Sequence, residues 1–331
     1  MRKILTYLFE HKTLSRAEAE EVLTNIAKGA YSDAEIAAFL TVYLMRSITV
    51  DELIGFRDAL LNLCTRIDLD GFDTIDVCGT GGDNKDTFNI STLSTFVLAG
   101  AGASVAKHGN YGVSSSCGSS NIMEYFGYKF SADPDKLKRE IENTRVCFLH
   151  APLFNPAMKN VAPVRKALKI KTFINILGPM INPSFPKKQF VGVFSLELAR
   201  LYNYLYQQSD KQFTIVHSLD GYDEVSLTDS AKIIVNGVEQ IASPESLGFS
   251  RVESKDLKNG ATLDDAALIF RNVLEGRGTK AQQMVVTANS ALALQCYFPG
   301  KPVDECIDMA RQSLESGKAL EAFKKLMNMQ S

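Results

Sequence analysis

The fold of this chain is limited above all by a cluster of glycines between a β-like run and a helical run. Thr74–Cys78 has strand character, Gly79-Thr80-Gly81-Gly82-Asp83 follows it, and an apolar helical run covers Leu93–Ala101. Glycines let backbone N–H groups approach a bound anion closely and permit positive φ angles. The amino end of the following helix attracts anions as well. The stretch therefore predicts a strand–turn–helix unit that holds a phosphate group.

Neither standard phosphate-binding motif accounts for this turn. The Walker A motif needs Gly-Lys-Ser/Thr at its end, and the dinucleotide fingerprint needs a glycine where Asn84 stands. A glycine-rich turn by itself also occurs between ordinary strands and helices. A plain turn, however, does not need many hydrogen-bonding side chains together. This one is accompanied by Asp83, Thr87, Asn89, Ser91 and Thr92.

The first part of the chain carries helix signals and no strand signal. Residues 1–70 contain three capping boxes, which mark helix starts: Ser15 with Glu18, Ser32 with Glu35, and Thr49 with Glu52. Gly29 stands where a helix is expected to stop. We therefore expect a small N-terminal α-helical domain.

Beyond residue 70, strand candidates alternate with helix candidates. This alternation predicts an α/β domain with a central mixed, largely parallel sheet flanked by helices. The strand candidates are Thr74–Cys78, Ser104–Lys107, Val146–His150, Phe190–Phe194, Gln212–His217 and Ile233–Val235. The helix candidates are Leu93–Ala101, Pro134–Asn143, Leu196–Gln208, Asp264–Leu274, Lys280–Gln295 and Val303–Leu326. Since ligands gather at the carboxyl ends of parallel strands, the loops after these strands are expected to converge.

Composition narrows the classes of function. The 331 residues carry a net charge of −2, so the basic surplus that is typical of nucleic-acid-binding proteins is lacking and no nucleic-acid partner is expected. Six cysteines and four histidines are scattered without paired spacing, which argues against a zinc site and favours free thiols in a reducing cytoplasm. No apolar run approaches the ~20 residues that cross a bilayer, and no N-terminal targeting signal is recognisable. We therefore expect a cytoplasmic protein without a membrane partner.

A second donor-rich stretch begins at Lys107 and runs through glycines and serines to Asn121. One ammonium group, several hydroxyls and many backbone N–H groups suit a pyrophosphate. The alternative is a flexible surface loop, because serine and glycine clusters are common in loops. His108 is a candidate for proton transfer, although a lone histidine beside a glycine turn is more often structural.

Two further stretches carry charged candidates. Arg165 could clamp a carboxylate with its planar guanidinium, but by residue type alone it fits a solvated helix charge better. Asp223 and Glu224 follow Asp220 around a glycine turn, and adjacent carboxylates suit Mg²⁺, which takes one or two carboxylates together with phosphate oxygens. The alternative is a solvated acidic turn. The donor-rich loops favour the metal site, since phosphate, Mg²⁺ and carboxylates form a coherent set.

In this order the four stretches resemble the anthranilate phosphoribosyltransferase family, of the superfamily that also contains the nucleoside phosphorylases. The resemblance covers roughly residues 3–325 and is densest in Gly79–Asp83 with Thr87–Thr92, Lys107–Asn110, Val161–Lys166, Asn175–Pro179 and Asp220–Ser226. It implies a helical domain of residues 1–70 joined by a segment near 166–190, an α/β domain of residues 71–165 and 191–331, and a homodimer. It further implies transfer of the phosphoribosyl group of phosphoribosyl pyrophosphate (PRPP) to anthranilate in tryptophan biosynthesis, with release of pyrophosphate.

The resemblance also assigns roles to the site residues. Mg²⁺, with two ions per subunit, is expected on Ser91, Asp223 and Glu224. Anthranilate is expected on Gly79, Asn110 and Arg165. No dedicated acid or base is expected, because the aryl amine already carries a free lone pair, and His108 is kept as a candidate helper. PRPP is expected on Gly79, Gly82, Asp83, Thr87, Asn89, Ile90, Ser91, Thr92, Lys107, His108, Gly109, Asn110, Ser114, Ser115 and Ser119.

The chain departs from the commoner family pattern in the second donor-rich stretch. Many members read Asn-Arg-Ser where this chain has Asn110-Tyr111-Gly112, so a cation is missing near the expected phosphate or anthranilate path. Two rival interpretations stay open: a pyrimidine nucleoside phosphorylase and a non-catalytic relative that binds nucleic acid. The Asp223–Glu224 pair and the run Thr87–Thr92 count against the phosphorylase, and the lack of a basic surplus counts against the nucleic-acid binder.

Overall fold

The computed structural model of the chain describes residues 1–112 and 117–330. By their internal packing the residues form two compact units. The first unit consists of Met1–Ile67 and Ala151–Phe185, and the second of Asp68–His150 and Pro186–Ser331. The chain therefore leaves the first unit, builds residues 68–150 of the second, returns to the first and then completes the second.

The first unit is helical throughout, as the sequence predicted. Its N-terminal helices are α1 (Arg2–Phe9), α2 (Arg16–Ala27), α3 (Asp33–Met45) and α4 (Val50–Leu63). The returning segment adds α8 (Ala151–Phe154), the 3₁₀ turn η1 (Pro156–Asn160), α9 (Ala162–Leu168), η2 (Phe173–Ile176) and η3 (Gly178–Met180). This segment begins before the expected 166–190, because η1 already packs on α2 and α4.

The helix starts of this unit were readable from local sequence. All three predicted capping boxes are present, and the side chain of Ser15, Ser32 or Thr49 accepts a hydrogen bond from the N–H three residues further on. Gly29, at φ 74°, follows the end of α2 in the left-handed conformation that commonly stops a helix.

A buried carboxylate ties these helices together. Glu52 is 0% exposed. It accepts hydrogen bonds from the N–H of Leu14 at 3.0 Å, the hydroxyl of Tyr43 at 3.1 Å and the guanidinium of Arg46 at 2.5 and 3.0 Å. These donors replace the water that a buried carboxylate loses. The capping residue of α4 is therefore also the polar centre of the helical unit.

Beside this centre lies a cluster of four aromatic rings, three from the N-terminal helices and one from the returning segment. Phe173 stacks on Phe56 with ring centroids 4.5 Å apart. The same ring meets Phe39 and Tyr43 edge-on, at 6.1 and 4.9 Å. The returning segment thus completes the core that the first four helices begin.

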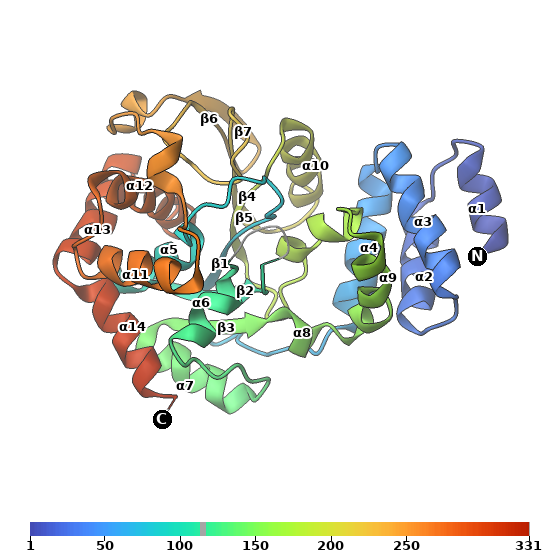
Figure 1. Ribbon diagram of the computed structural model, residues 1–331, viewed down its shortest axis with the longest axis horizontal. Helices are drawn as coiled ribbons and strands as arrows, with labels where there is room; N and C mark the ends of the chain where they lie inside the picture. The colour runs from blue at the N-terminus through green and yellow to red at the C-terminus, as the bar shows by residue number, and fades with distance from the viewer. Residues whose placement is uncertain (113–116, 331) are drawn as a thin grey trace. The chain divides into compact units, whose positions relative to one another are not determined.

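The second unit is built on a seven-stranded sheet in the order β3-β2-β1-β4-β5-β6-β7 (Figure 1). The strands from β3 to β5 are parallel and the last two are antiparallel, so the prediction of a mixed, largely parallel sheet is confirmed. Strand β7 was not predicted, because its residues are exposed up to the last and carry no buried apolar pattern. The strands are β1 (Thr74–Gly79), β2 (Ser104–Gly109), β3 (Val146–His150), β4 (Lys188–Gly192), β5 (Gln212–Ser218), β6 (Ala231–Val235) and β7 (Val238–Ala242).

Helices flank this sheet (Figure 1). They are α5 (Ile90–Gly100), α6 (Ser119–Tyr125), α7 (Pro134–Thr144), α10 (Leu196–Tyr206), α11 (Leu263–Leu274), α12 (Lys280–Tyr297), α13 (Val303–Glu315) and α14 (Lys318–Asn328). The single helix predicted over Val303–Leu326 is wrong: the chain breaks into α13 and α14 at Gly317, whose φ is 77°. Helix α6 was not predicted. In the part of the chain described, no helix combines the length and apolar character needed to cross a membrane.

Candidate active site

The two predicted phosphate-binding loops follow the carboxyl ends of β1 and β2, and the carboxyl end of β4 lies beside that of β1. Chain order runs from β1 toward β3 on one side and from β4 toward β7 on the other, so these neighbouring strands form the switch point of the sheet. Ligands of open parallel sheets bind at such points. Gly79 and Gly192 end the two strands and pair with each other in register.

Asp223 lies across this pair of glycines. A Cβ atom at position 79 would stand 3.1 Å from Cγ of Asp223, and one at position 192 would stand 2.5 Å from its carbonyl carbon. Real Cβ atoms essentially never come closer than 3.0 Å to such a neighbour, so position 192 admits only glycine while Asp223 keeps its place. Gly192 was missed from sequence, because the residue that requires it comes from a distant loop.

The loop after Gly79 turns through several residues in the left-handed conformation. They are Gly81 (φ 63°), Gly82 (φ 83°), Asn84 (φ 60°) and Asp86 (φ 51°). The N–H of Gly81 donates to Oδ2 of Asp223 at 2.6 Å, which ties this loop to the acidic loop. At the end of the loop, the N–H of Phe88 donates to the carbonyl of Leu257 at 3.0 Å.

Helix α5 begins directly after this loop, and the N–H of Ile90, its first residue, donates to the carbonyl of Phe88 at 2.6 Å. Its N-cap residue Asn89 makes no side-chain cap among the described residues, and its first turn has no acidic residue. The amide of Asn89 instead donates to the carbonyl of Cys117 at 3.1 Å, which joins the two donor-rich loops. The amino end of a helix is a ready site for an anion, and the carboxylate of Glu224 accepts a hydrogen bond from the N–H of Ser91 there.

Lys107 reaches this helix end from β2. Its side chain is buried, and Nζ donates to the carbonyl of Val77 and to Oγ of Ser91, the latter at 3.3 Å. Burial lowers the pKa of Lys107, and the nearby carboxylate of Asp76 opposes this. Asp76, fully buried in β1, also accepts from the N–H of His108 at 3.1 Å. A phosphate placed here would meet a cation directly in front of helix α5.

The acidic pair, Asp223 and Glu224, lies at the same amino end of α5. Burial and the neighbouring carboxylate of Asp83 raise the pKa of Asp223 to about 8. Burial and the carboxylates of Asp223 and Asp83 raise the pKa of Glu224 well above its usual range. Hydrogen bonds from the N–H of Ser91 and the hydroxyl of Thr87 oppose that rise. The sequence did not predict that Asp83 joins the pair.

These carboxylates fit a magnesium ion. Oδ2 of Asp83 is buried and has no hydrogen-bond donor among the described residues, and it faces a second carboxylate. Carboxylates crowded together in a buried place favour a nearby cation, and the atoms available to bind it are oxygens, as Mg²⁺ prefers. Within residues 1–112 and 117–330, no three His, Cys, Asp or Glu side chains form a complete metal cage. A bound ion would therefore complete its shell with water and phosphate oxygens, which is the usual habit of Mg²⁺.

The second donor-rich stretch is partly described. Predicted Ser114 and Ser115 lie outside the described residues, whereas Gly109, Asn110 and Ser119 lie within them. Oγ of Ser119 donates to the carbonyl of Asn110 at 3.4 Å, which closes the loop on itself.

Tyr111, which stands where many family members have arginine, is turned toward α6 and β3. Its hydroxyl donates to Oε1 of Glu124 at 3.3 Å, and its ring lies edge-on to His150 with centroids 4.8 Å apart. Asn121, in the first turn of α6, caps the start of this helix and closes the loop, since Oδ1 accepts from the N–H of Gly112 at 2.9 Å and of Gly118 at 3.0 Å.

Arg165 belongs to the other unit, on α9. Its side chain is half-buried, burial lowers its pKa, and among the described residues it forms no ion pair with a carboxylate. A desolvated guanidinium in this state suits a carboxylate ligand. The helper role of His108 and the anthranilate contact of Arg165 stay predictions.

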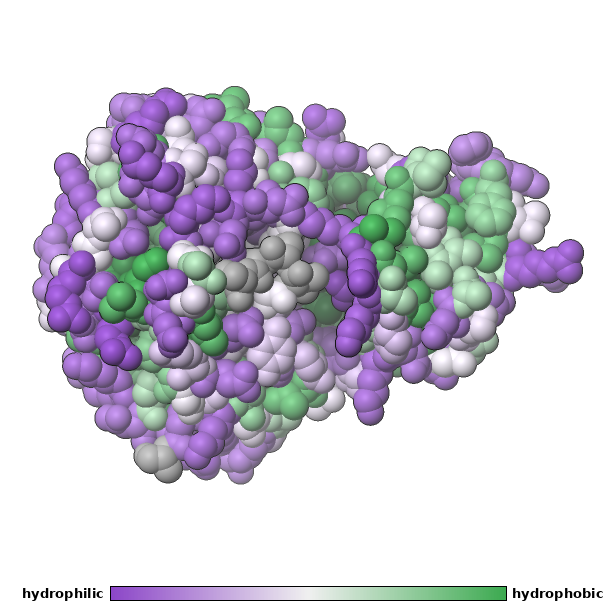
Figure 2. Space-filling model, viewed as in Figure 1, coloured by the Kyte–Doolittle hydropathy of each residue, from purple (hydrophilic) through white to green (hydrophobic). Residues whose placement is uncertain are grey.

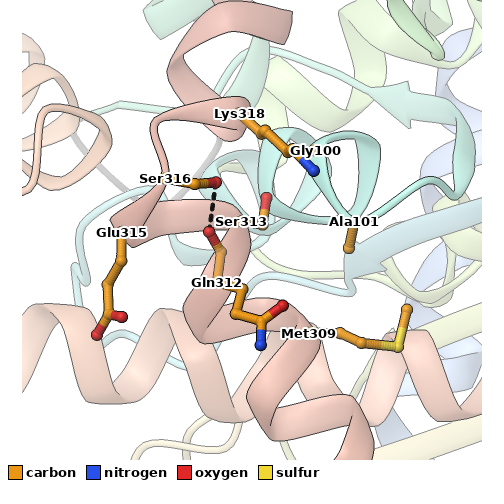
Figure 3. A pocket seen from close by; sticks show the side chains of 8 residues that line it. All are labelled: Gly100, Ala101, Met309, Gln312, Ser313, Glu315, Ser316 and Lys318. Atoms are coloured by element: carbon orange, nitrogen blue, oxygen red, sulfur yellow. Dashed lines mark hydrogen bonds between the residues drawn. The ribbon is translucent and has the colours of Figure 1, made fainter.

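A separate pocket of about 520 Å³ lies at the opposite end of α5 (Figure 3). It is lined by Gly100 and Ala101 together with residues around the α13–α14 junction, such as Gln312, Ser316 and Lys318. Oγ of Ser316 donates to the carbonyl of Gln312 at 2.6 Å, so this hydroxyl is engaged in its own helix. The length of α5, about 16 Å, separates this pocket from the predicted site.

Comparison with known proteins identifies the family. The α/β domain of a glycosyl transferase family matches residues 71–320, and the helical bundle domain of a glycosyl transferase family matches residues 2–64. Anthranilate phosphoribosyltransferases from Christiangramia forsetii and Flavobacterium johnsoniae are each 56% identical to the chain, over 99% of both sequences. The chain belongs to the anthranilate phosphoribosyltransferase family.

Solved structures of anthranilate phosphoribosyltransferases have the same fold. The enzyme from Thermus thermophilus superposes with a TM-score of 0.91 at 28% identity, covering 98% of both chains. The enzyme from Saccharomyces cerevisiae superposes with a TM-score of 0.90 at 24% identity, covering 98% of this chain and 96% of its own. The expected combination of a helical domain and a larger α/β domain is thereby confirmed.

Proposed function

We propose that the chain transfers the phosphoribosyl group of PRPP to the amine of anthranilate, giving N-(5-phosphoribosyl)anthranilate and pyrophosphate, in tryptophan biosynthesis. The observation that carries this function is the meeting of three features at the β1–β4 switch point: the amino end of α5, the buried ammonium of Lys107 and the Asp223–Glu224 pair. Relatives that are 51–56% identical bear the name of this transferase, which favours it over a nucleoside phosphorylase.

PRPP would occupy the donor-rich side of this site. The start of α5 and Lys107 supply N–H groups and a cation to the phosphate oxygens. The residues proposed to bind it are those expected from the sequence: Gly79, Gly82, Asp83, Thr87, Asn89, Ile90, Ser91, Thr92, Lys107, His108, Gly109, Asn110, Ser114, Ser115 and Ser119.

The reaction needs stabilisation of charge more than proton transfer. The bond from ribose C1 to the pyrophosphate oxygen breaks, the amine nitrogen forms a bond to C1, and the amine proton passes to solvent. Negative charge therefore grows on the leaving pyrophosphate, where preorganised N–H groups and the ammonium of Lys107 would stabilise it. The rest of the effect is the alignment of the two substrates.

We propose that Ser91, Asp223 and Glu224 hold Mg²⁺, with two ions per subunit. The bound ions would neutralise the charge that develops on the pyrophosphate. A structure of the Saccharomyces cerevisiae relative is a complex with PRPP and Mg. The crowded carboxylates of Asp83 and Asp223 support a cation at this point.

We propose Gly79, Asn110 and Arg165 as the anthranilate contacts. The Saccharomyces cerevisiae relative has also been solved with 4-fluoroanthranilate. Arg165 supports the assignment because its guanidinium is partly buried and forms no ion pair with a carboxylate among the described residues.

We propose a homodimer formed through the helical unit. The exposed apolar side chains of α1 and α3 include Phe9 at 63% and Met45 at 84% exposed. Figure 2 shows green, apolar surface over the helices of this unit. Exposed apolar patches of this kind mark interaction surfaces. Sedimentation at low micromolar concentration tests the proposal, and a monomer there would contradict it.

The decisive assay follows anthranilate fluorescence with time in the presence of PRPP, with and without Mg²⁺. A decay that needs both substances supports the proposed function. The Asp223→Asn/Glu224→Gln double variant should lose the Mg²⁺-dependent decay and keep its fold. Asp229→Asn is the matched control, because this partly exposed carboxylate of the same loop accepts from the N–H of Ser230 at 2.7 Å and forms a surface ion pair with Arg251.

Two results would contradict the proposal. Full activity of the double variant would remove the metal assignment. Phosphate-dependent cleavage of thymidine or uridine, with no anthranilate decay, would place the chain among the nucleoside phosphorylases.

The anthranilate assignment has its own test. Arg165→Ala should raise KM for anthranilate at least about tenfold, because a charge-assisted pair is lost, and should change KM for PRPP little. Lys166→Ala, an exposed cation of the same helix, is the control. Equal losses for both substrates would show that Arg165 is not the selective anthranilate contact.

A further inference from the structure

The two peptide groups on either side of Val225 are held by side chains. The carbonyl of Glu224 accepts from Oγ of Ser218 at 2.7 Å, and the N–H of Val225 donates to Oδ1 of Asn289 at 3.0 Å. In the next peptide group the partners exchange: the carbonyl of Val225 accepts from Nδ2 of Asn289 at 2.9 Å, and the N–H of Ser226 donates to Oγ of Ser218 at 3.0 Å. Ser218 and Asn289 thus each form a hydrogen bond with both peptide groups, and we call this arrangement the brace.

This brace replaces the secondary structure that the segment lacks. Residues 219–230 connect β5 to β6 without a helix or strand, yet Val225 is only 1% exposed. Buried backbone N–H and C=O groups need partners, and an unmade bond there is costly. Ser218 ends β5 and Asn289 lies inside α12, so two rigid elements supply the partners.

The amide of Asn289 is suited to this task in a way that similar side chains are not. It is 1% exposed, and its second N–H donates to the carbonyl of Val285 in its own helix at 2.8 Å. Oδ1 therefore faces an N–H, while Nδ2 faces two carbonyl oxygens. A carboxylate of the same shape would place a negative oxygen against both carbonyls, so the position requires an amide and not merely its volume.

We propose that Asn289 and Ser218 are positioning residues for the metal-binding pair. By bracing the peptide groups next to Glu224 they hold Asp223 and Glu224 over the ends of β1 and β4. The proposal builds on the proposed function, in which these carboxylates bind Mg²⁺. Groups that orient metal ligands without touching the metal typically alter metal affinity by about 10–100-fold when removed.

The test compares Asn289→Ala, Asn289→Asp and Ser218→Ala with the wild-type chain. The main readout is Mn²⁺ affinity in the presence of PRPP, measured by electron paramagnetic resonance. The second is hydrogen exchange of residues 219–228, and the third is the unfolding midpoint in urea. Asn203→Ala is the matched control: within the described residues, the side chain of this buried amide on α10 makes one long hydrogen bond, 3.5 Å to Glu239, which is not part of the acidic loop.

We expect Mn²⁺ to bind about tenfold more weakly to all three variants than to the wild-type chain. Exchange in residues 219–228 should accelerate in the same variants, and KM for anthranilate should stay within about twofold of wild type. The control should keep wild-type Mn²⁺ affinity even where its unfolding midpoint falls. Should Asn289→Ala fail to fold, the isosteric Asn289→Asp and the smaller change Ser218→Ala carry the test.

Two results would overturn the inference in distinguishable ways. If the wild-type chain binds Mn²⁺ and is active, and Asn289→Asp and Ser218→Ala bind Mn²⁺ with the same affinity, the positioning role alone is refuted. A wild-type chain that binds no Mn²⁺ with PRPP would refute the proposed function together with the role of the brace.

Discussion

Replacing Gly192 by alanine should damage the acidic loop without straining β4 itself. The φ angle of Gly192 lies outside the left-handed region, so alanine adopts the same backbone freely. The new Cβ would stand 2.5 Å from the carbonyl carbon of Asp223, whereas ordinary contacts begin at 3.4 Å. The carbonyl oxygen of Asp223 lies closer still, so the Asp223 peptide must withdraw by more than about 1 Å, a displacement that in active sites costs on the order of 100-fold in rate or more.

We expect kcat/KM to fall about 100-fold, which corresponds to about 2.7 kcal/mol of transition-state stabilisation. Overpacking should also lower the free energy of unfolding by about 1–3 kcal/mol. Anthranilate fluorescence at several Mg²⁺ concentrations measures the first effect, and urea denaturation measures the second. The loss should be larger at low Mg²⁺, because the displaced residue is a proposed metal ligand.

The control is Gly71→Ala, just before β1. A Cβ there meets nothing within 4 Å, and the backbone is again acceptable to alanine. This variant should behave as the wild-type chain in both assays. If Gly192→Ala kept wild-type kcat/KM at every Mg²⁺ concentration, the place of Asp223 over the glycine pair would not matter for activity, and the reasoning would be refuted.

Two further predictions concern buried charges. Burial by itself would raise the pKa of Glu52, but hydrogen bonds from Arg46 and two backbone N–H groups outweigh it and lower the pKa below 4.5. The stability that Glu52 contributes is therefore present above pH 4.5 and lost as the pH falls through its folded-state pKa. Glu52→Gln should lower the free energy of unfolding by about 3 kcal/mol at pH 7 and by less at pH 4, and urea curves with the same gap at both pH values would contradict this. Lys107→Met should raise KM for PRPP about tenfold or more, since a charge-assisted contact is lost; an unchanged KM for PRPP in steady-state assays would count against a phosphate contact.

The fold was predictable where the signal is local. The capping boxes of α2, α3 and α4 depend on residues three apart, and the strands β1 to β6 each carry an apolar run. Prediction failed where the signal is weak or ambiguous. Strand β7 is an exposed edge strand, and a glycine such as Gly317 can either end a helix or lie within one, so its presence alone does not decide between the two. The boundary at Ala151 depends on packing against helices far away in sequence.

The residues of the candidate site were likewise predictable where the signal is local and not where it depends on a neighbour in space. The glycine loop, Lys107 and the acidic pair were visible because each carries its chemistry in its residue types. Gly192 and Asn289 were not, because their importance comes from one neighbour in space: Asp223 for the glycine and Val225 for the amide. No pattern within either helix or strand marks such residues, and only the arrangement of the sheet brings the partners together.

The ring cluster around Phe173 has a consequence for how the chain is made. Phe173 supplies the ring that stacks on Phe56, but residues 68–150 of the other unit are synthesised between them. The four N-terminal helices therefore leave the ribosome with one face of their core uncovered. Their core is completed only when the returning segment has been synthesised and packs Phe173 against Phe56. Synthesis that stops before residue 173 yields a helical unit with an exposed aromatic face, so the unit is completed only after residues 68–150 of its neighbour have emerged.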